Sequence, residues 1–222
     1  MALIGIAVSY FMWTRMRDMD TRSVKLEQSK ANNDRLKSML KVFLPVSLLV
    51  LSRAMMSTML TTFLPTFLRS EGASLWFSGA ALTLIGAAGA VGSYISGSLS
   101  DRIGRKKVVA VSLVVTPLLM LAFLQIKGWA QVPLLLLIGF FSWSIIPVMM
   151  AMVMEQFIED RSFATGMYMA MTFILNSLAM LLVGKVADIY SLRVSFMISA
   201  FLLPIGLISL FLIPKPPSRV HG

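Results

Sequence analysis

Cysteine is absent from the 222 residues of this chain, and histidine occurs once, at His221. Without cysteine the chain forms no disulfide, offers no thiolate to a metal and has no thiol nucleophile. A histidine next to the end of the chain is expected to be a tail residue. The apolar runs contain no acidic pair, and the sequence contains no phosphate-binding P-loop. We therefore predict that the chain is not an enzyme and holds no metal or other cofactor.

Charged residues are scarce as well, at 14% of the chain, while 57% of the residues are hydrophobic. The mean hydropathy is +0.82, far from the values of soluble domains. Twenty basic residues against ten acidic ones make a net charge of +10. Because the basic residues gather between apolar runs, they indicate the cytoplasmic face of a membrane rather than a nucleic-acid partner.

Long apolar runs are the main feature of the sequence. A helix needs about 20 apolar residues to cross about 30 Å of hydrocarbon. Six runs reach this length: Val42 to Leu68, Ser74 to Leu99, Val108 to Ile126, Gln131 to Met154, Phe163 to Val186 and Leu192 to Ile213. The sequence therefore predicts an all-α, polytopic membrane helix bundle with six full transmembrane helices.

The segments around this bundle, residues 42–213, differ in kind. Residues 1–13 are apolar but reach only about 20 Å as a helix, which predicts a partial transmembrane helix or an interfacial anchor. Residues 14–41 carry mixed charge and are predicted to be a basic cytoplasmic linker, and residues 214–222 a cytoplasmic tail. With the linker inside, 15 of the 20 basic residues lie inside and four outside, as the positive-inside rule requires.

The sharpest motif, GSLSDRIGRKK, runs from Gly97 to Lys107 between the second and third runs, and we expect a short cytoplasmic loop at Ser100 to Lys107. Gly97 lets its helix approach a neighbour closely, and Gly104 can adopt the positive φ of a tight turn.

The charged residues of this motif allow two interpretations. Asp101 is placed to pair with an arginine or to accept from backbone N–H groups at a helix N-terminus, which favours a conformational latch. The basic residues would fix the topology and meet anionic lipid headgroups, and in the alternative interpretation they are only a basic topology anchor; they are Arg102, Arg105, Lys106 and Lys107.

The motif resembles the loop signature of the major facilitator superfamily, which joins the second and third helices of a six-helix half. Other stretches also resemble this family: TTFLPTFL at Thr61, GAAGAVG at Gly86, EQFIEDRSFATG at Glu155 and GKVADIYSLRVSF at Gly184. Together they are most similar to the C-terminal half of a drug-efflux transporter of the fosmidomycin-resistance branch.

The resemblance implies half of a twelve-helix fold in a bacterial inner (plasma) membrane, working by alternating access. It implies a secondary active transporter, a proton-coupled antiporter that exports a small molecule or drug. Its partners would be lipid, the substrate, protons, and either an N-terminal six-helix half, in the same or a separate polypeptide, or a second copy. The alternative is a truncated, non-transporting membrane module or regulatory subunit derived from a transporter.

Small residues on the second run include Gly86, Gly89 and Gly92, which permit close helix packing in lipid, either as a static contact or as a sliding one.

Three polar residues are further site candidates. Arg53 lies about 16 Å into the first run, where a charge is costly, so we expect a role in substrate binding or proton coupling. The alternative is a structural arginine that snorkels to the membrane surface or bonds backbone carbonyls. Asn176 is a candidate substrate contact, or else an interhelical hydrogen-bonding group. For Glu155, at the cytoplasmic end of the fourth run, the resemblance implies a gate contact; the alternative is an ordinary solvated acid.

Overall fold

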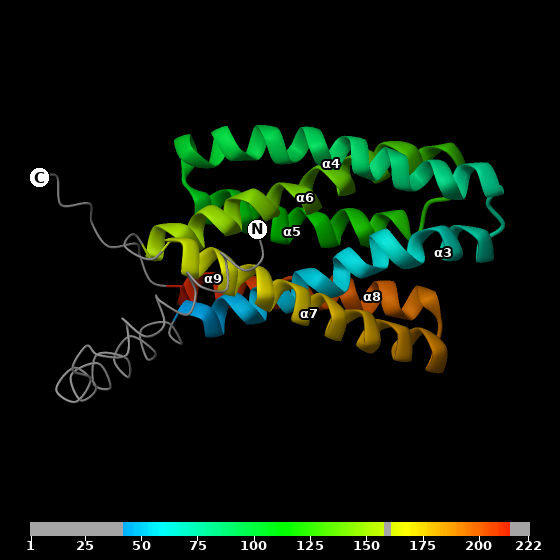
Figure 1. Ribbon diagram of the computed structural model, residues 1–222. Coiled ribbons are helices and arrows are strands. Elements are labelled where there is room, and N and C mark those ends of the chain that lie inside the picture. Colours follow the sequence, from blue (N-terminus) through cyan, green and yellow to red (C-terminus); the bar gives the residue numbers. More distant parts are fainter. Residues whose placement is uncertain (1–41, 158–160, 214–222) are drawn as a thin grey trace, which may run out of the picture. The chain divides into compact units, whose positions relative to one another are not determined.

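The structure of the chain is a computed structural model that describes residues 42–157 and 161–213. Every described element is helical (Figure 1). The predicted partial helix at 1–13, the linker at 14–41 and the tail at 214–222 lie outside the described residues.

Six helical spans in the described residues are long and apolar enough to cross a membrane. They cover Val42–Ser70, Leu75–Ile103, Arg105–Phe123, Gly128–Gln156, Arg161–Ile189 and Leu192–Leu212. The all-helical bundle expected from the apolar runs is thereby confirmed, and each span lies within a few residues of its predicted place.

The first span begins as an α-helix at residues 42–58 and changes to the π-helix η1, Met59–Phe63, before ending as α3, Leu64–Ser70. Pro65 explains this change, because it lacks the N–H that would otherwise bond to the carbonyl of Thr61. The Thr61 hydroxyl donates to the carbonyl of Ser57 at 2.9 Å, inside the same irregular stretch.

The next four spans are α4 (Leu75–Ile103), α5 (Arg105–Phe123), the short 3-10 helix η2 (Gly128–Ala130) running into α6 (Gln131–Gln156), and α7 (Arg161–Ile189). The sixth span consists of α8 (Leu192–Leu202) and α9 (Ile205–Leu212).

Local signals explain several of these boundaries. Ser74 and Ser191 cap α4 and α8, because each hydroxyl accepts from a backbone N–H three residues later, at 3.2 Å. Pro204 lies between α8 and α9, where its missing N–H interrupts the helix.

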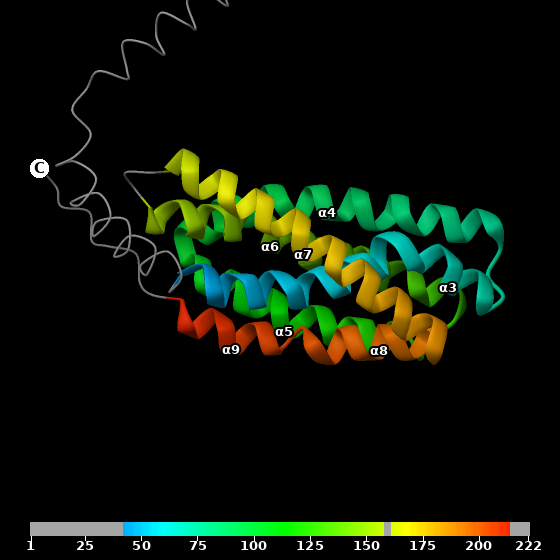
Figure 2. The same ribbon diagram turned by 60° about the horizontal axis from the view of Figure 1, so that its bottom comes forward.

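Successive spans run in opposite directions, so their connections gather at two ends of the bundle (Figures 1 and 2). One end, which we call the Gly104 end, holds the start of the first span, Gly104, the end of α6, the start of α7 and the end of α9. The other, which we call the Glu71 end, holds residues 71–74, 124–127 and 190–191.

Aromatic packing joins three spans near the Glu71 end. Phe67 of α3 lies between Phe196 of α8 and Phe123 of α5, with ring centroids 4.9 and 6.3 Å apart. All three rings are buried. Such packing holds the first, third and sixth spans as one body.

The spans differ in how much of their surface this bundle covers. Two thirds of the apolar window of the first span is buried, against 28% for α4 and 17% for α7. Large apolar side chains such as Phe173 and Ile174 of α7 point outward. The uncovered faces of α4 and α7 therefore require lipid or further protein around them.

Candidate functional site

Gly104 alone connects α4 to α5. The first helix ends at Ile103 and the second begins at Arg105, while Gly104 adopts φ +101°. Only glycine adopts this backbone conformation without strain. The loop expected at residues 100–107 is therefore wrong, because its charged side chains belong to the last turn of α4 and the first turn of α5. Helix geometry, rather than a flexible loop, orients them.

Arg105 lies between two carboxylates at this junction. Its Nη2 atom is 3.1 Å from Oδ1 of Asp101 on α4 and 3.1 Å from Oε1 of Glu155 on α6. The arginine side chain is 23% exposed, so these ion pairs are less screened than fully exposed ones. A salt bridge at a water-accessible helix end can open and close at modest cost.

The other basic residues of the motif make different contacts. Lys106 donates from Nζ to the backbone carbonyl of Ile213, just beyond the end of α9. A cation at this position complements the negative end of the helix dipole. Arg102 is exposed and makes no polar contact within the described residues. The junction is thus linked to α6 and to the sixth span, and Arg102 is left facing outward.

The small residues of α4 divide into two groups. A Cβ atom at Gly89 would lie 2.7 Å from the ring of Trp143, and one at Gly92 would overlap the carbonyl oxygen of Phe140. At Gly86 and Gly97 a Cβ atom would meet nothing within 4 Å, so the close approach expected at these two positions is not present in the described chain.

Sequence reasoning missed the partner glycine on the facing helix. A Cβ atom at Gly139 of α6 would overlap the backbone oxygen of Ile85, so the close contact is formed from both sides. A lone glycine in an otherwise bulky apolar helix was the available signal.

Serine hydroxyls join the same two helices. Ser93 donates to the carbonyl of Trp143 at 3.1 Å, and Ser96 donates to the carbonyl of Ser144 at 3.0 Å. We call this contact, with Gly89, Gly92 and Gly139, the α4–α6 seam. A seam with backbone contact and two interhelical hydrogen bonds favours static packing over sliding.

Arg53 is buried inside the bundle, with 8% of its surface exposed. Arg53 comes nine residues after the exposed Leu44, which is two and a half turns of an α-helix. The two side chains therefore point from opposite sides of the helix. Tyr168 of α7, which is also buried, lies within electrostatic range of the guanidinium. The Nε atom of Arg53 has no hydrogen-bond partner, and no carboxylate among the described residues pairs with the guanidinium.

Asn176 lies half-buried near the middle of α7. Within residues 42–157 and 161–213 its amide makes no hydrogen bond, so it does not serve as the interhelical link that was the alternative for this residue.

Glu71 forms a second charged cluster, which the sequence analysis did not find. Its carboxylate lies 2.8 Å from Nζ of Lys127 and 3.5 Å from Nη1 of Arg193, and Arg193 also donates to the carbonyl of Leu124 at 2.8 Å. The hydrogen bond from Lys127, with the charge of Arg193, holds the pKa of Glu71 below its ordinary value. Two connections and the first turn of α8 are thereby linked at the Glu71 end.

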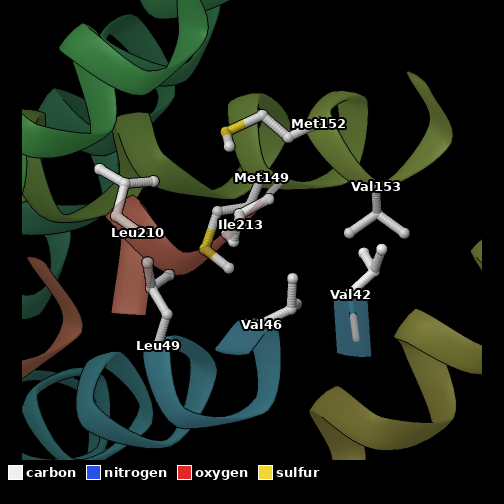
Figure 3. Close-up of a pocket in the computed structure, with 8 residues that line it drawn as sticks. All are labelled: Val42, Val46, Leu49, Met149, Met152, Val153, Leu210 and Ile213. Atoms are coloured by element: carbon white, nitrogen blue, oxygen red, sulfur yellow. The ribbon is translucent and has the colours of Figure 1, made fainter. Parts of the chain in front are cut away.

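Apolar contacts complete the Gly104 end. The stacked rings of Phe43 and Phe157, 5.7 Å apart, link the start of the first span to the end of α6. Beside them is a small apolar pocket between the first span, α6 and α9 (Figure 3). Its lining residues are Val42, Val46, Leu49, Met149, Met152, Val153, Leu210 and Ile213. Flexible methionine side chains can adapt to movement of this end.

Comparison with known proteins adds one finding to this geometry. The sequence model of the family described as Major Facilitator Superfamily matches residues 2–222. No curated protein shows a significant similarity to the chain.

Proposed function

Because the chain belongs to the major facilitator superfamily, we propose that it is the C-terminal six-helix half of a secondary active transporter. In alternating access, two six-helix halves rock against each other around a site at the membrane midplane. The second half is an N-terminal half, in the same or a separate polypeptide, or a second copy of this chain. The uncovered apolar faces of α4 and α7 support such a partner.

The single observation that carries this proposal is the position of Arg105 between Asp101 and Glu155. Alternating access needs a contact that is stable in one state and released in another. An ion pair between two helix ends, with Glu155 about one third exposed, meets that requirement. We assign Glu155 as the gate residue and the Gly104 junction as the latch.

Contacts between helices link the spans at each end of the half, which supports movement of the half as one body. Ser209 of α9 donates to the carbonyl of Pro45, and Lys106 reaches Ile213, at the Gly104 end. Glu71 joins Lys127 and Arg193 at the other end. Rigid-body rocking requires this kind of internal linkage.

Arg53 supplies the charge for substrate or proton coupling. Arginine keeps its proton in proteins, so Arg53 does not carry the coupling proton itself. It would instead hold an anionic group of the substrate or a carboxylate from the second half, whose protonation it would sense. The absence of any carboxylate partner among the described residues supports this role, and Asn176 is a further substrate contact.

We assign the Gly104 end to the cytoplasm of a bacterial inner membrane, and the transport to proton-coupled efflux of a small molecule or drug. The sequence supports this orientation, because 15 of the 20 basic residues lie in segments predicted to be inside and four in segments predicted to be outside. The similarity of the motifs to the fosmidomycin-resistance branch supports drug export.

Export of antibiotics, including fosmidomycin, from efflux-deficient cells tests the proposal. Cells would express the chain alone, or the chain with a matching N-terminal half, and Glu155→Gln would serve as the gate-deficient control. Export only on co-expression would support a half transporter, and export by the chain alone would support a homodimer. No export of any compound in either case would contradict transport and favour a non-transporting module.

A further inference from the structure

Pro147 lies inside α6 and leaves one backbone carbonyl without its usual partner. In a regular helix, the carbonyl of Trp143 accepts from the N–H four residues later, but residue 147 is proline and has no N–H. An unpaired carbonyl in the hydrocarbon region is costly, since no water is available to bond with it. The freed carbonyl of Trp143 therefore needs a donor from another helix.

Ser93 of α4 is that donor. Its hydroxyl lies 3.1 Å from the carbonyl oxygen of Trp143. The bond is possible because Gly89 and Gly92 let α4 approach the backbone of α6. One residue further along α6, Ser96 donates to the carbonyl of Ser144 at 3.0 Å. Two successive carbonyls on the N-terminal side of Pro147 are thus held by α4.

The part of α6 beyond Pro147 carries the gate residue of the proposed function. Residues 148–156 form its last turns and end beside Arg105, which Glu155 contacts at 3.1 Å. Proline weakens the helix where these turns leave the α4–α6 seam. The direction of the last turns therefore depends on how the carbonyl of Trp143 is held.

We infer that Ser93 is a positioning residue for the gate: it replaces the hydrogen bond that Pro147 removes and so fixes the last turns of α6 with Glu155 beside Arg105. This inference rests on the proposed function only in the assignment of Glu155 as the gate. The simpler alternative is that Ser93 is a packing residue whose effect does not depend on Pro147.

A double-mutant cycle separates these alternatives, because Pro147→Ala restores the N–H that makes Ser93 necessary. The variants are Ser93→Ala, Pro147→Ala and the combination, in the full chain in lipid nanodiscs. Ser98→Ala is the matched control, since Ser98 is an exposed serine of α4 that bonds only within its own helix, to the carbonyl of Ile95.

Two measurements report on the last turns of α6 without any need for transport. The first is hydrogen exchange of the amides of residues 148–156. The second is cross-linking of the Arg105→Cys and Glu155→Cys pair by a short bifunctional thiol reagent, which is specific because the natural chain has no cysteine.

We expect Ser93→Ala to speed exchange and slow cross-linking roughly threefold, the factor that corresponds to an average interhelical hydrogen bond in a membrane protein. In the Pro147→Ala background the same substitution should have almost no effect, and Ser98→Ala should match the natural chain. Equal effects of Ser93→Ala in both backgrounds, or no effect in either, would overturn the inference.

The transport assay of Glu155→Gln keeps the two proposals distinct. If that variant transports normally while the cycle shows coupling, the gate assignment fails and the positioning role of Ser93 stands.

Discussion

Lys127 donates a hydrogen bond across 2.8 Å to the carboxylate of Glu71, which joins the α3–α4 connection to the α5–α6 connection. The pKa of Glu71 lies below its ordinary value because of this bond and the nearby Arg193. A carboxyl whose pKa is lowered on folding adds stability above its unfolded pKa, about 4.3 for glutamate, and loses that contribution as the pH falls through the folded pKa.

Glu71→Gln should therefore lower the thermal midpoint of the chain at pH 7 and have a progressively smaller effect as the pH falls below about 4. The measurement is thermal unfolding in detergent across this pH range. Because the Lys127 side chain is 69% exposed and that of Glu71 is 25% exposed, water screens the pair, so the shift should be small and should shrink further at high salt. A difference between variant and natural chain that stays constant with pH would contradict the ion-pair role.

A second prediction concerns the contribution of the α4–α6 seam to the stability of the bundle. Gly92→Ala places a methyl group against the carbonyl oxygen of Phe140, so it should destabilise the bundle by about 1–3 kcal/mol, as overpacking does. Gly86→Ala is the matched control on the same helix, because its Cβ atom meets nothing within 4 Å. Unfolding by increasing SDS in mixed micelles measures both. Equal tolerance of the two substitutions would mean that the helices can separate at Gly92.

Much of this fold could be predicted from the sequence, because apolar length alone decides which segments can cross a membrane. The six spans and the tight turn at Gly104 follow from local residues. The contacts of Glu71, Gly139 and Ser93 could not be predicted in this way. Each depends on a residue about 50 or more positions away, and only the packing of helices decides which partners meet.

The site shows the same division between local and distant information. That Asp101 pairs with Arg105 follows from their spacing of four residues on adjoining helix ends. That Arg53 faces the interior of the bundle does not follow from its depth in an apolar run, because depth along a helix does not determine which face of the helix a side chain occupies.

The orientation of the bundle yields a third prediction. Lys107 lies at the Gly104 end and Gln125 at the Glu71 end, and both residues are exposed. The two variants are Lys107→Cys and Gln125→Cys. In intact cells a membrane-impermeant maleimide should label the cysteine at 125 and leave the one at 107 unlabelled until the membrane is broken. The natural chain, without cysteine, is the blank. Labelling of 107 alone in intact cells would reverse the assigned topology.

The latch makes a fourth prediction, on transport. Arg105→Gln removes both ion pairs, and Glu155→Gln removes one, so each should reduce export by the complete transporter roughly fivefold, the effect of about 1 kcal/mol on the balance between two states. Arg102→Gln removes the same charge from the neighbouring helix end but no contact, and should leave export unchanged. If Arg102→Gln is equally damaging, the motif acts through its total charge, as a topology anchor would.

A fifth prediction concerns Arg53→Met, for which we expect stability to be kept or raised and transport to be lost. A buried charge with no carboxylate partner among the residues that the structure describes opposes folding, so Arg53→Met should leave the stability unchanged or raise it by about 1 kcal/mol or more. If the charge holds the substrate or a carboxylate of the second half, the same variant should abolish export.

Thermal unfolding of the purified chain, together with export by the complete transporter, measures both effects of Arg53→Met. Arg53→Lys is the matched control, because it keeps the charge and loses the planar guanidinium. Partial export by Arg53→Lys would show that charge is what the site requires. A fall in stability for Arg53→Met, with export surviving in the molecules that fold, would instead identify a structural arginine that bonds backbone carbonyls.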